Sequence, residues 1–277
     1  MKTIAVLLTV HNRREKTLHA LRRLYAVPLP SDYRLRVFLT DDGCTDGTAE
    51  AVREQFPEVE MLQGDGTLFW NRGMRLAWKA AARENPDFYL WLNDDTFLFD
   101  RALEVLLRTS AEESHQAIVL GSTCDTATEQ QITYGGKAEN GAYVLDAARA
   151  MPCRYMNGNI VLIPRAVFEK VGYNDAHYRH AMGDYDYGLM AHRKGVRVLV
   201  APGFLGACDL HATVATWKNP EKPLRERWQA MWRPTGANPI EYFYYRRKHF
   251  GLVPACATFV SNLVHLLFPQ WWSPDRH

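Results

Sequence analysis

Apolar and polar positions in the first hundred residues alternate between two periods, one typical of strands and one of helices. Continuous apolar runs predict strands, and apolar residues spaced three and four apart predict helices. The predicted strands are 4–9, 36–40, 58–62 and 88–92, and the predicted helices are 14–25, 45–55 and 70–84. Strand–helix alternation indicates a parallel sheet with right-handed crossovers, so we expect an α/β fold.

The second half of the chain is less regular. We predict strands at 117–121, 142–145, 158–163 and 197–201, and helices at 165–171 and 184–194. Residues 207–220 show no clear period and are expected to form a loop.

One junction carries the clearest chemical signal. The apolar run 88–92, typical of a strand buried on both faces, stops at Asn93-Asp94-Asp95. In open α/β sheets, ligands bind at the carboxyl ends of the strands. Hard divalent cations that also hold a diphosphate prefer oxygen ligands of this kind. A solvated turn followed by a helix capped by Asp100 explains the segment equally well.

Three further polar motifs end predicted strands or begin a helix. Asp41-Asp42-Gly43 could accept the imide N–H of a uracil or thymine ring or bind a ribose hydroxyl, although this motif is also a common turn. Asp184 and Asp186 begin a predicted helix, whose N-terminus stabilises anions, and one of them could serve as a general base. N-capping explains one of these acids but not both. His211 could complete a Mn²⁺ site beside carboxylates, although a lone histidine is more often structural.

The turn after the first predicted strand lacks glycine-rich phosphate motifs. Neither Gly-x-Gly-x-x-Gly nor Gly-Lys-Ser/Thr is present, which excludes a dinucleotide fold and a P-loop. The negative charge of a bound phosphate group would have to be neutralised in another way. A metal ion held by Asp94 and Asp95 could neutralise it.

Composition limits the partners and the compartment. The net charge of +2 comes without a dense Lys/Arg stripe, so nothing indicates a nucleic-acid partner. The five cysteines form no Cys-x-x-Cys pair, which fits a reducing, cytoplasmic compartment.

Residues 251–268 are the one membrane candidate, but they contain Pro254, Asn262 and His265. Aromatic and cationic residues at 242–249 precede them, and Trp271-Trp272 follow. A helix at the headgroup level and a helix packed on this chain or on a second subunit explain the pattern equally well. A true span is less favoured.

In this order and spacing, the motifs resemble glycosyltransferase family 2, over about residues 3–215. The closest likeness is to bacterial rhamnosyltransferase-like enzymes. The motifs that carry it are Leu8-Thr9-Val10-His11-Asn12-Arg13, Thr40-Asp41-Asp42-Gly43-Cys44-Thr45-Asp46-Gly47-Thr48, Trp70-Asn71-Arg72-Gly73, Leu92-Asn93-Asp94-Asp95, Gly183-Asp184-Tyr185-Asp186 and His211.

The resemblance implies the A-type glycosyltransferase fold, a Rossmann-like nucleotide-binding sheet domain with an acceptor-side subdomain and C-terminal helices. It places a catalytic domain at 1–215, with a nucleotide-sugar half at about 1–96 and an acceptor half at 97–215, and a helical extension at 216–277. The site roles implied are Thr9, Asn12, Asp41, Asp42, Asp65, Arg72 and Asp94 for the nucleotide-sugar donor, Asp95 and His211 for Mn²⁺ or Mg²⁺, Asp184 for the catalytic base, and Asp186 for the acceptor or for support of the base.

This sequence departs from the family pattern at three positions that matter. Asn93 replaces the first acid of the metal motif, and Gly183 replaces the Glu before the base. Met190 stands where an Arg often follows. Cys44 in place of Ser is a minor change.

The resemblance implies inverting transfer of a sugar from dTDP-rhamnose or a UDP-sugar to a saccharide acceptor. The aromatic and basic C-terminus suggests that this acceptor is lipid-linked, as in O-antigen or capsule synthesis at the inner face of the cytoplasmic membrane. Dimer packing explains that C-terminus as well. The alternatives are a non-catalytic nucleotide-sugar-binding scaffold and a sugar nucleotidyltransferase, although 11–14 is not the Gly-rich loop of the latter.

Overall fold

The apolar run before Asn93 is a strand at the centre of the main sheet. In the computed structural model, which describes residues 1–210 and 215–271, β4 (Phe88–Leu92) has all five side chains buried. It pairs in parallel with β1 (Lys2–Val10) and antiparallel with β12 (Ile160–Pro164). The prediction of a strand buried on both faces is confirmed.

Within the described residues, ten strands form the main sheet, and its central path runs β10-β13-β6-β12-β4-β1-β2-β3. The remaining strands of this sheet are β2 (Tyr33–Asp41), β3 (Glu60–Gln63), β5 (Phe97–Leu98), β6 (Ala117–Cys124), β7 (Ile132–Tyr134), β10 (Met151–Pro152) and β13 (Arg197–Ala207). A small second sheet contains β11 (Tyr155–Met156), β8 (Gly136–Lys137) and β9 (Tyr143–Val144).

The first four strands of the chain are parallel, as their alternation with helices predicted. β3, β2, β1 and β4 pair in parallel from neighbour to neighbour. The second half differs, because β12 runs antiparallel to both β4 and β6. The chain between β6 and β12 returns through turns and short strands instead of a helix, and such a connection permits antiparallel pairing.

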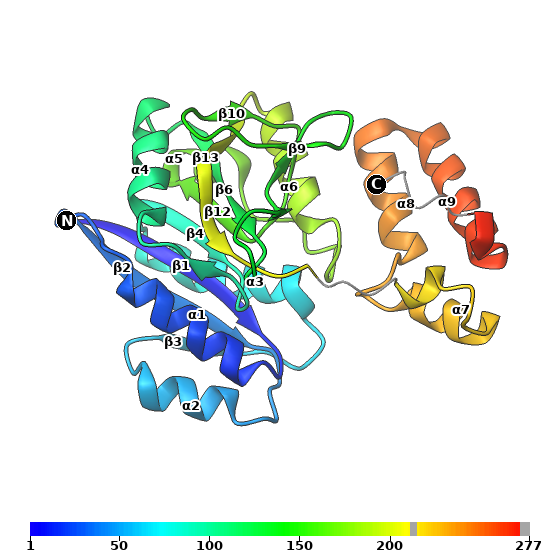
Figure 1. The fold of residues 1–277 in the computed structure, drawn as a ribbon, viewed down its shortest axis with the longest axis horizontal. Helices are drawn as coiled ribbons and strands as arrows, with labels where there is room; N and C mark the ends of the chain where they lie inside the picture. The colour runs from blue at the N-terminus through cyan, green and yellow to red at the C-terminus, as the bar shows by residue number, and fades with distance from the viewer. Residues whose placement is uncertain (211–214, 272–277) are drawn as a thin grey trace.

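Helices cover both faces of the sheet (Figure 1). Along β1, Ile4, Val6 and Leu8 pack on one face, and Ala5 and Leu7 pack on the other. The first face is covered by α1 (Arg14–Ala26), α2 (Thr48–Gln55) and α4 (Ala102–Glu112). The second is covered by α3 (Phe69–Ala81), α5 (Arg165–Val171) and α6 (Gly183–Arg193). These two apolar layers fix the sheet edge that carries the polar motifs.

The C-terminal helices form a group beside the sheet, with α8 between α9 and the α/β part (Figure 1). Their bounds are η2 (Thr216–Lys218), α7 (Leu224–Trp232), α8 (Pro239–Phe250), α9 (Leu252–Leu267) and η3 (Pro269–Trp271). Gly251 separates α8 from α9 with φ 97°, a conformation that favours glycine. Among the helices of the described residues, none is both long and apolar enough to cross a bilayer.

Some element ends differ from the sequence-based prediction. The helix expected over 70–84 divides into α3 and the 3₁₀ turn η1 (Ala82–Glu84). Asp100 does not cap α4, because its carboxylate accepts a hydrogen bond from Arg23 Nη2 at 2.9 Å. The loop expected at 207–220 contains the end of β13 and the turn η2, and its residues 211–214 lie outside the described part of the chain.

Candidate functional site

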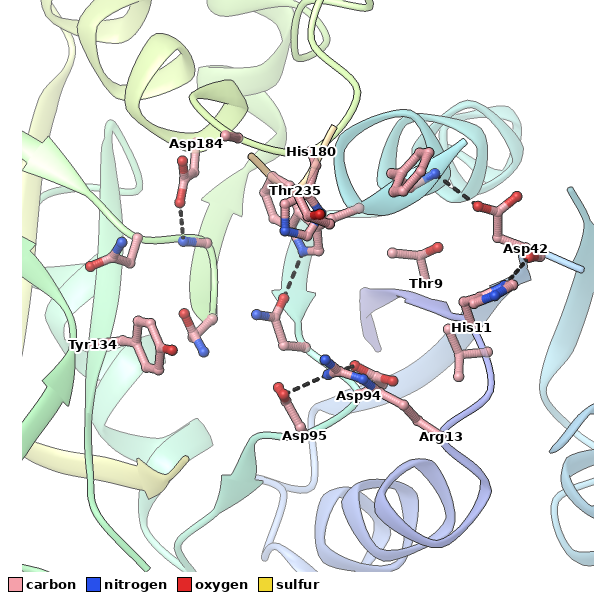
Figure 2. Close-up of a pocket in the computed structure, with 18 of the residues that line it drawn as sticks. Thr9, His11, Arg13, Asp42, Asp94, Asp95, Tyr134, His180, Asp184 and Thr235 are labelled. Carbon is pink, nitrogen blue, oxygen red and sulfur yellow. Dashed lines mark hydrogen bonds and ion pairs between the residues drawn. The ribbon is translucent and has the colours of Figure 1, made fainter. Parts of the chain in front are cut away.

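A pocket of about 830 Å³ lies at the carboxyl ends of β1, β2 and β4. Five of the predicted site residues line it, namely Thr9, Asp42, Asp94, Asp95 and Asp184. Figure 2 shows Thr9, His11 and Asp42 on one side, Asp184 and Tyr134 on the other, and Arg13 with the Asp94–Asp95 pair between them. Segments from both halves of the chain therefore build one cavity.

Arg13 bridges the two carboxylates at the end of β4. Its Nη1 lies 2.6 Å from Asp95 Oδ2 and 3.3 Å from Asp94 Oδ1. Both acids are buried, while the Arg13 side chain is 38% exposed. Burial raises the pKa of Asp94 to about 7, even though the charge of Arg13 lowers it. The cost of burying the charged carboxylate therefore outweighs its stabilisation by the charge of Arg13.

The same pair fits a divalent cation. Asp94 Oδ2 is buried and has no hydrogen-bond partner among the described residues. Such an orphaned carboxylate oxygen is costly unless a cation or a ligand satisfies it. Carboxylate oxygens also suit Mg²⁺ and Mn²⁺. Within residues 1–210 and 215–271, no cluster of three ligating side chains forms, and the predicted ligand His211 lies outside these residues.

The side chain of Asn93 is hydrogen-bonded to a neighbouring side chain. Its Oδ1 accepts a hydrogen bond from Trp70 Nε1 at 2.7 Å. Trp70 also packs against Trp91 of β4. The amide that replaces the family's first acid thus anchors an indole in the pocket wall.

Asp184 faces the carboxylate pair from the opposite wall of the pocket (Figure 2). It lies in the first turn of α6, and its Oδ2 accepts a hydrogen bond from Gly158 N at 3.0 Å. Burial raises the pKa of Asp184 to about 6, against the hydrogen bonds that stabilise its anion. A carboxylate tuned toward neutral pH can accept a proton from a substrate hydroxyl.

Asp42 organises the loop before α3. Its carboxylate accepts hydrogen bonds from the backbone N–H groups of Gly66, Leu68 and Phe69 at 2.8–3.2 Å. Its backbone oxygen accepts a hydrogen bond from His11 Nδ1 at 2.6 Å. Asp42 therefore holds together one side of the pocket.

Comparison with known proteins identifies the family. A family model described as glycosyl transferase family 2 matches residues 5–172, more than half of the chain. The chain belongs to glycosyltransferase family 2. No curated protein sequence matches it significantly.

Solved structures agree with the family on the fold. The crystal structure of S. aureus TarS 1-349 in complex with UDP-GlcNAc has a TM-score of 0.60 at 13% identity, covering 97% of this chain and 73% of that one. Against the longer TarS chain, this protein spans only 44% of the length. The mannosyltransferase PcManGT from Pyrobaculum calidifontis, in complex with GDP-Man and Mn²⁺, has a TM-score of 0.57 at 16% identity, with 98% and 81% covered. The family 2 chain has the A-type glycosyltransferase fold.

Four predicted donor residues do not line the pocket of this family 2 protein. Asn12 Oδ1 accepts a hydrogen bond from Thr45 N, and Asp41 Oδ1 accepts one from Cys44 N. Asp65 is exposed and accepts hydrogen bonds from Thr67, while Arg72 Nε donates to Ala176 O. These side chains support turns and loops around the pocket. Their roles in donor binding stay predictions.

Asp186 does not reach the pocket either. It is fully buried, and its carboxylate accepts hydrogen bonds from Tyr178, Lys248 and His249. Direct contact with an acceptor is therefore not available in this arrangement.

Sequence reasoning assigned no role to several residues that line the pocket, among them Arg13, Trp70, Tyr134, His180 and Thr235. For Arg13 a partial signal existed, because it is a cation close after the predicted strand 4–9, but only the structure shows that β1 lies beside β4. For Thr235 there was none, because only the folding back of the C-terminal helices brings it to the pocket.

The Gly183 departure has a packing cause. A Cβ at this position would overlap the side chain of Asn71. Asn71 cannot move aside easily, because its Nδ2 donates to Asp175 O and Tyr178 O, both at 2.8 Å. The close packing of α6 against α3 therefore leaves no room at position 183 for the Glu side chain of the family pattern.

We expect Gly183→Ala to lower the free energy of unfolding by about 1–3 kcal/mol, because the added methyl overpacks a fixed contact. Gly188→Ala on the same helix is the matched control. Its Cβ would lie 3.0 Å from Met156 Cγ, part of a flexible side chain, and a helical Gly→Ala change gains about 0.5–1 kcal/mol. Urea denaturation measures both. Equal stability of the two variants would contradict the packing argument.

Proposed function

We propose that this protein is an inverting glycosyltransferase that moves a sugar from a nucleoside diphosphate sugar to a hydroxyl of a saccharide acceptor. The observation that carries the proposal is the placement of Asp184 across one pocket from the Asp94–Asp95 pair. Membership of family 2 supports it. The named ligands of two structural neighbours, UDP-GlcNAc and GDP-Man, support a nucleotide-sugar donor.

In the proposed reaction, Asp184 accepts the proton of the acceptor hydroxyl as the oxygen attacks the anomeric carbon. The new carbon–oxygen bond forms on the face opposite the bond to the diphosphate, which breaks, so the configuration inverts. Asp184 is anionic above about pH 6, as a general base requires. Asp94 and Asp95 would hold Mn²⁺ or Mg²⁺. A cation bound there would neutralise the charge that develops on the leaving diphosphate.

The finer assignments follow the family likeness. We propose dTDP-rhamnose or a UDP-sugar as the donor, and a role in O-antigen, capsule or other cell-surface polysaccharide synthesis. A lipid-linked acceptor at the inner face of the cytoplasmic membrane would suit the exposed apolar side chains of α9, which are Leu252, Val253, Val260 and Leu267. The same face could pack against a second copy of the chain.

A non-catalytic nucleotide-sugar-binding scaffold is the second candidate. Two observations favour it. The Asn93 side chain is hydrogen-bonded to Trp70, and position 183 is a glycine where the family pattern has Glu. Release of sugar from the donor in the absence of acceptor, assayed across nucleotide sugars, separates the two candidates. An enzyme turns over the donor slowly, whereas a scaffold binds it unchanged.

Metal removal tests the role of the carboxylate pair. We expect chelator to abolish transfer and Mn²⁺ or Mg²⁺ to restore it, because the pair and the diphosphate repel each other without a cation. A thermal-shift screen of nucleotide sugars with and without Mn²⁺ should show a donor that raises the melting temperature only with metal. Full activity in chelator would contradict the metal site.

A further inference from the structure

Helix α8 is joined to α6 through an ionic cluster around a buried carboxylate, close to Asp184 in the sequence. Asp186 lies two residues after Asp184 on α6 and is 0% exposed. Its Oδ1 accepts hydrogen bonds from Tyr178 Oη at 2.9 Å and from His249 Nε2 at 2.6 Å. Its Oδ2 accepts one from Lys248 Nζ at 2.8 Å. Lys248 and His249 both come from the last turn of α8.

A second carboxylate completes the cluster. Lys248 Nζ also donates to Asp175 Oδ2 at 2.8 Å, and Tyr244 Oη donates to the same oxygen at 3.0 Å. Around these groups, Tyr178, Leu189 and Tyr245 form a small apolar core between α6 and α8. A buried carboxylate with several charged or polar donors is held in one geometry, because loss of a donor leaves charge without compensation.

The C-terminal helices also reach the pocket wall at a second place. Glu241 of α8 pairs with Arg179 at 2.8 Å, next to the pocket residue His180. Thr235, from the loop between α7 and α8, lines the pocket near His180 (Figure 2). The helical extension therefore supports the wall that carries Asp184.

We propose that Lys248 and His249 are positioning residues that act through Asp186 to hold α6, and with it the carboxylate of Asp184, in the reactive geometry. This inference rests on the proposed role of Asp184 as the base. Outside its own helix, Asp184 accepts a hydrogen bond from Gly158 N at 3.0 Å and is hydrogen-bonded to the side chain of Asn157, so a small shift of α6 would misplace it relative to both. A misplacement of about 1 Å can cost on the order of 10²-fold in rate.

The test compares Lys248→Met with Lys248→Arg and with Arg23→Met. Arg23 is a similarly half-buried cation that pairs with Asp100 on the far side of the sheet. We expect Lys248→Met to lower kcat by about 10- to 100-fold with the donor KM within about twofold, because α6 supplies the base and not the donor site. The acid limb of its pH–rate profile is the fall in rate that accompanies protonation of Asp184. This limb should move to lower pH than in the wild type, because a looser α6 exposes Asp184 to water. Lys248→Arg should recover most of the rate, and Arg23→Met should match the wild type.

Hydrogen exchange gives a readout that needs no turnover. Residues 183–193 should exchange faster in Lys248→Met than in Arg23→Met. If Lys248→Met does not fold, Asp186→Asn is measured in its place, with the same expected changes. A variant that loses stability but keeps the wild-type kcat, acid limb and exchange in 183–193 would overturn the proposal. If the wild type transfers no sugar, the proposed function fails, and unchanged exchange would still reject the positioning role separately.

Discussion

Asp184→Asn is expected to lower the rate of sugar transfer by about 10²- to 10⁴-fold, the usual contribution of a general base. The amide cannot accept the proton of the acceptor hydroxyl, although it matches the carboxylate in size. Donor binding should persist, because Asp184 lies on the wall opposite the Asp94–Asp95 pair. Steady-state kinetics measures the first effect, and a thermal shift with donor measures the second.

The pH profile of the wild type adds an independent readout. Below a pH of about 6 the base is protonated, so the rate should fall about tenfold per pH unit. The residual rate of Asp184→Asn should lack this limb. Asp32→Asn, at an exposed position away from the pocket, is the matched control and should behave like the wild type. Near-normal turnover by Asp184→Asn would remove Asp184 from the mechanism.

Arg13→Met is expected to destabilise the metal-free protein by about 1–3 kcal/mol at about pH 8. Breaking a fully buried ion pair costs about 3–5 kcal/mol, and the 38% exposure of Arg13 reduces this through solvent screening. The loss arises because Asp94 and Asp95 lose the guanidinium that offsets their negative charge. Urea denaturation in chelator measures it.

The sign of the pH dependence follows from Asp94. Its pKa in the folded protein is raised to about 7, so its protonated form favours folding, and that contribution is lost as the pH rises through 7. The cost of Arg13→Met should therefore shrink at about pH 5.5, where Asp94 is neutral. Mn²⁺ should also stabilise the variant more than the wild type, because the cation no longer competes with Arg13. Arg23→Met removes a pairing with the exposed Asp100 and hydrogen bonds to the backbone oxygen of Leu98, but it leaves no buried carboxylate unpaired, so it should show neither effect. An equal loss at both pH values, without a response to Mn²⁺, would contradict this account.

Local patterns in the sequence were enough to predict the strands and helices from β1 to β4. The apolar run 88–92 specified a buried strand because every residue in it faces packed side chains, and period and burial are local properties. Helix ends were predicted less well, since capping depends on neighbours, as the pairing of Asp100 with Arg23 shows. The apolar run of β12 did not predict that this strand would be antiparallel to β4. The direction of a strand in the sheet depends on the path of the chain that leads into it.

For the site, the sequence by itself determined which acids end the strands and begin α6, and the family resemblance grouped Asp94, Asp95 and Asp184 as site residues. Only the tertiary structure decided what surrounds them. Arg13 meets a carboxylate pair more than eighty residues away, and Lys248 meets Asp186 across sixty-two. Contacts between such distant segments depend on the packing of whole helices and strands, which no local period encodes.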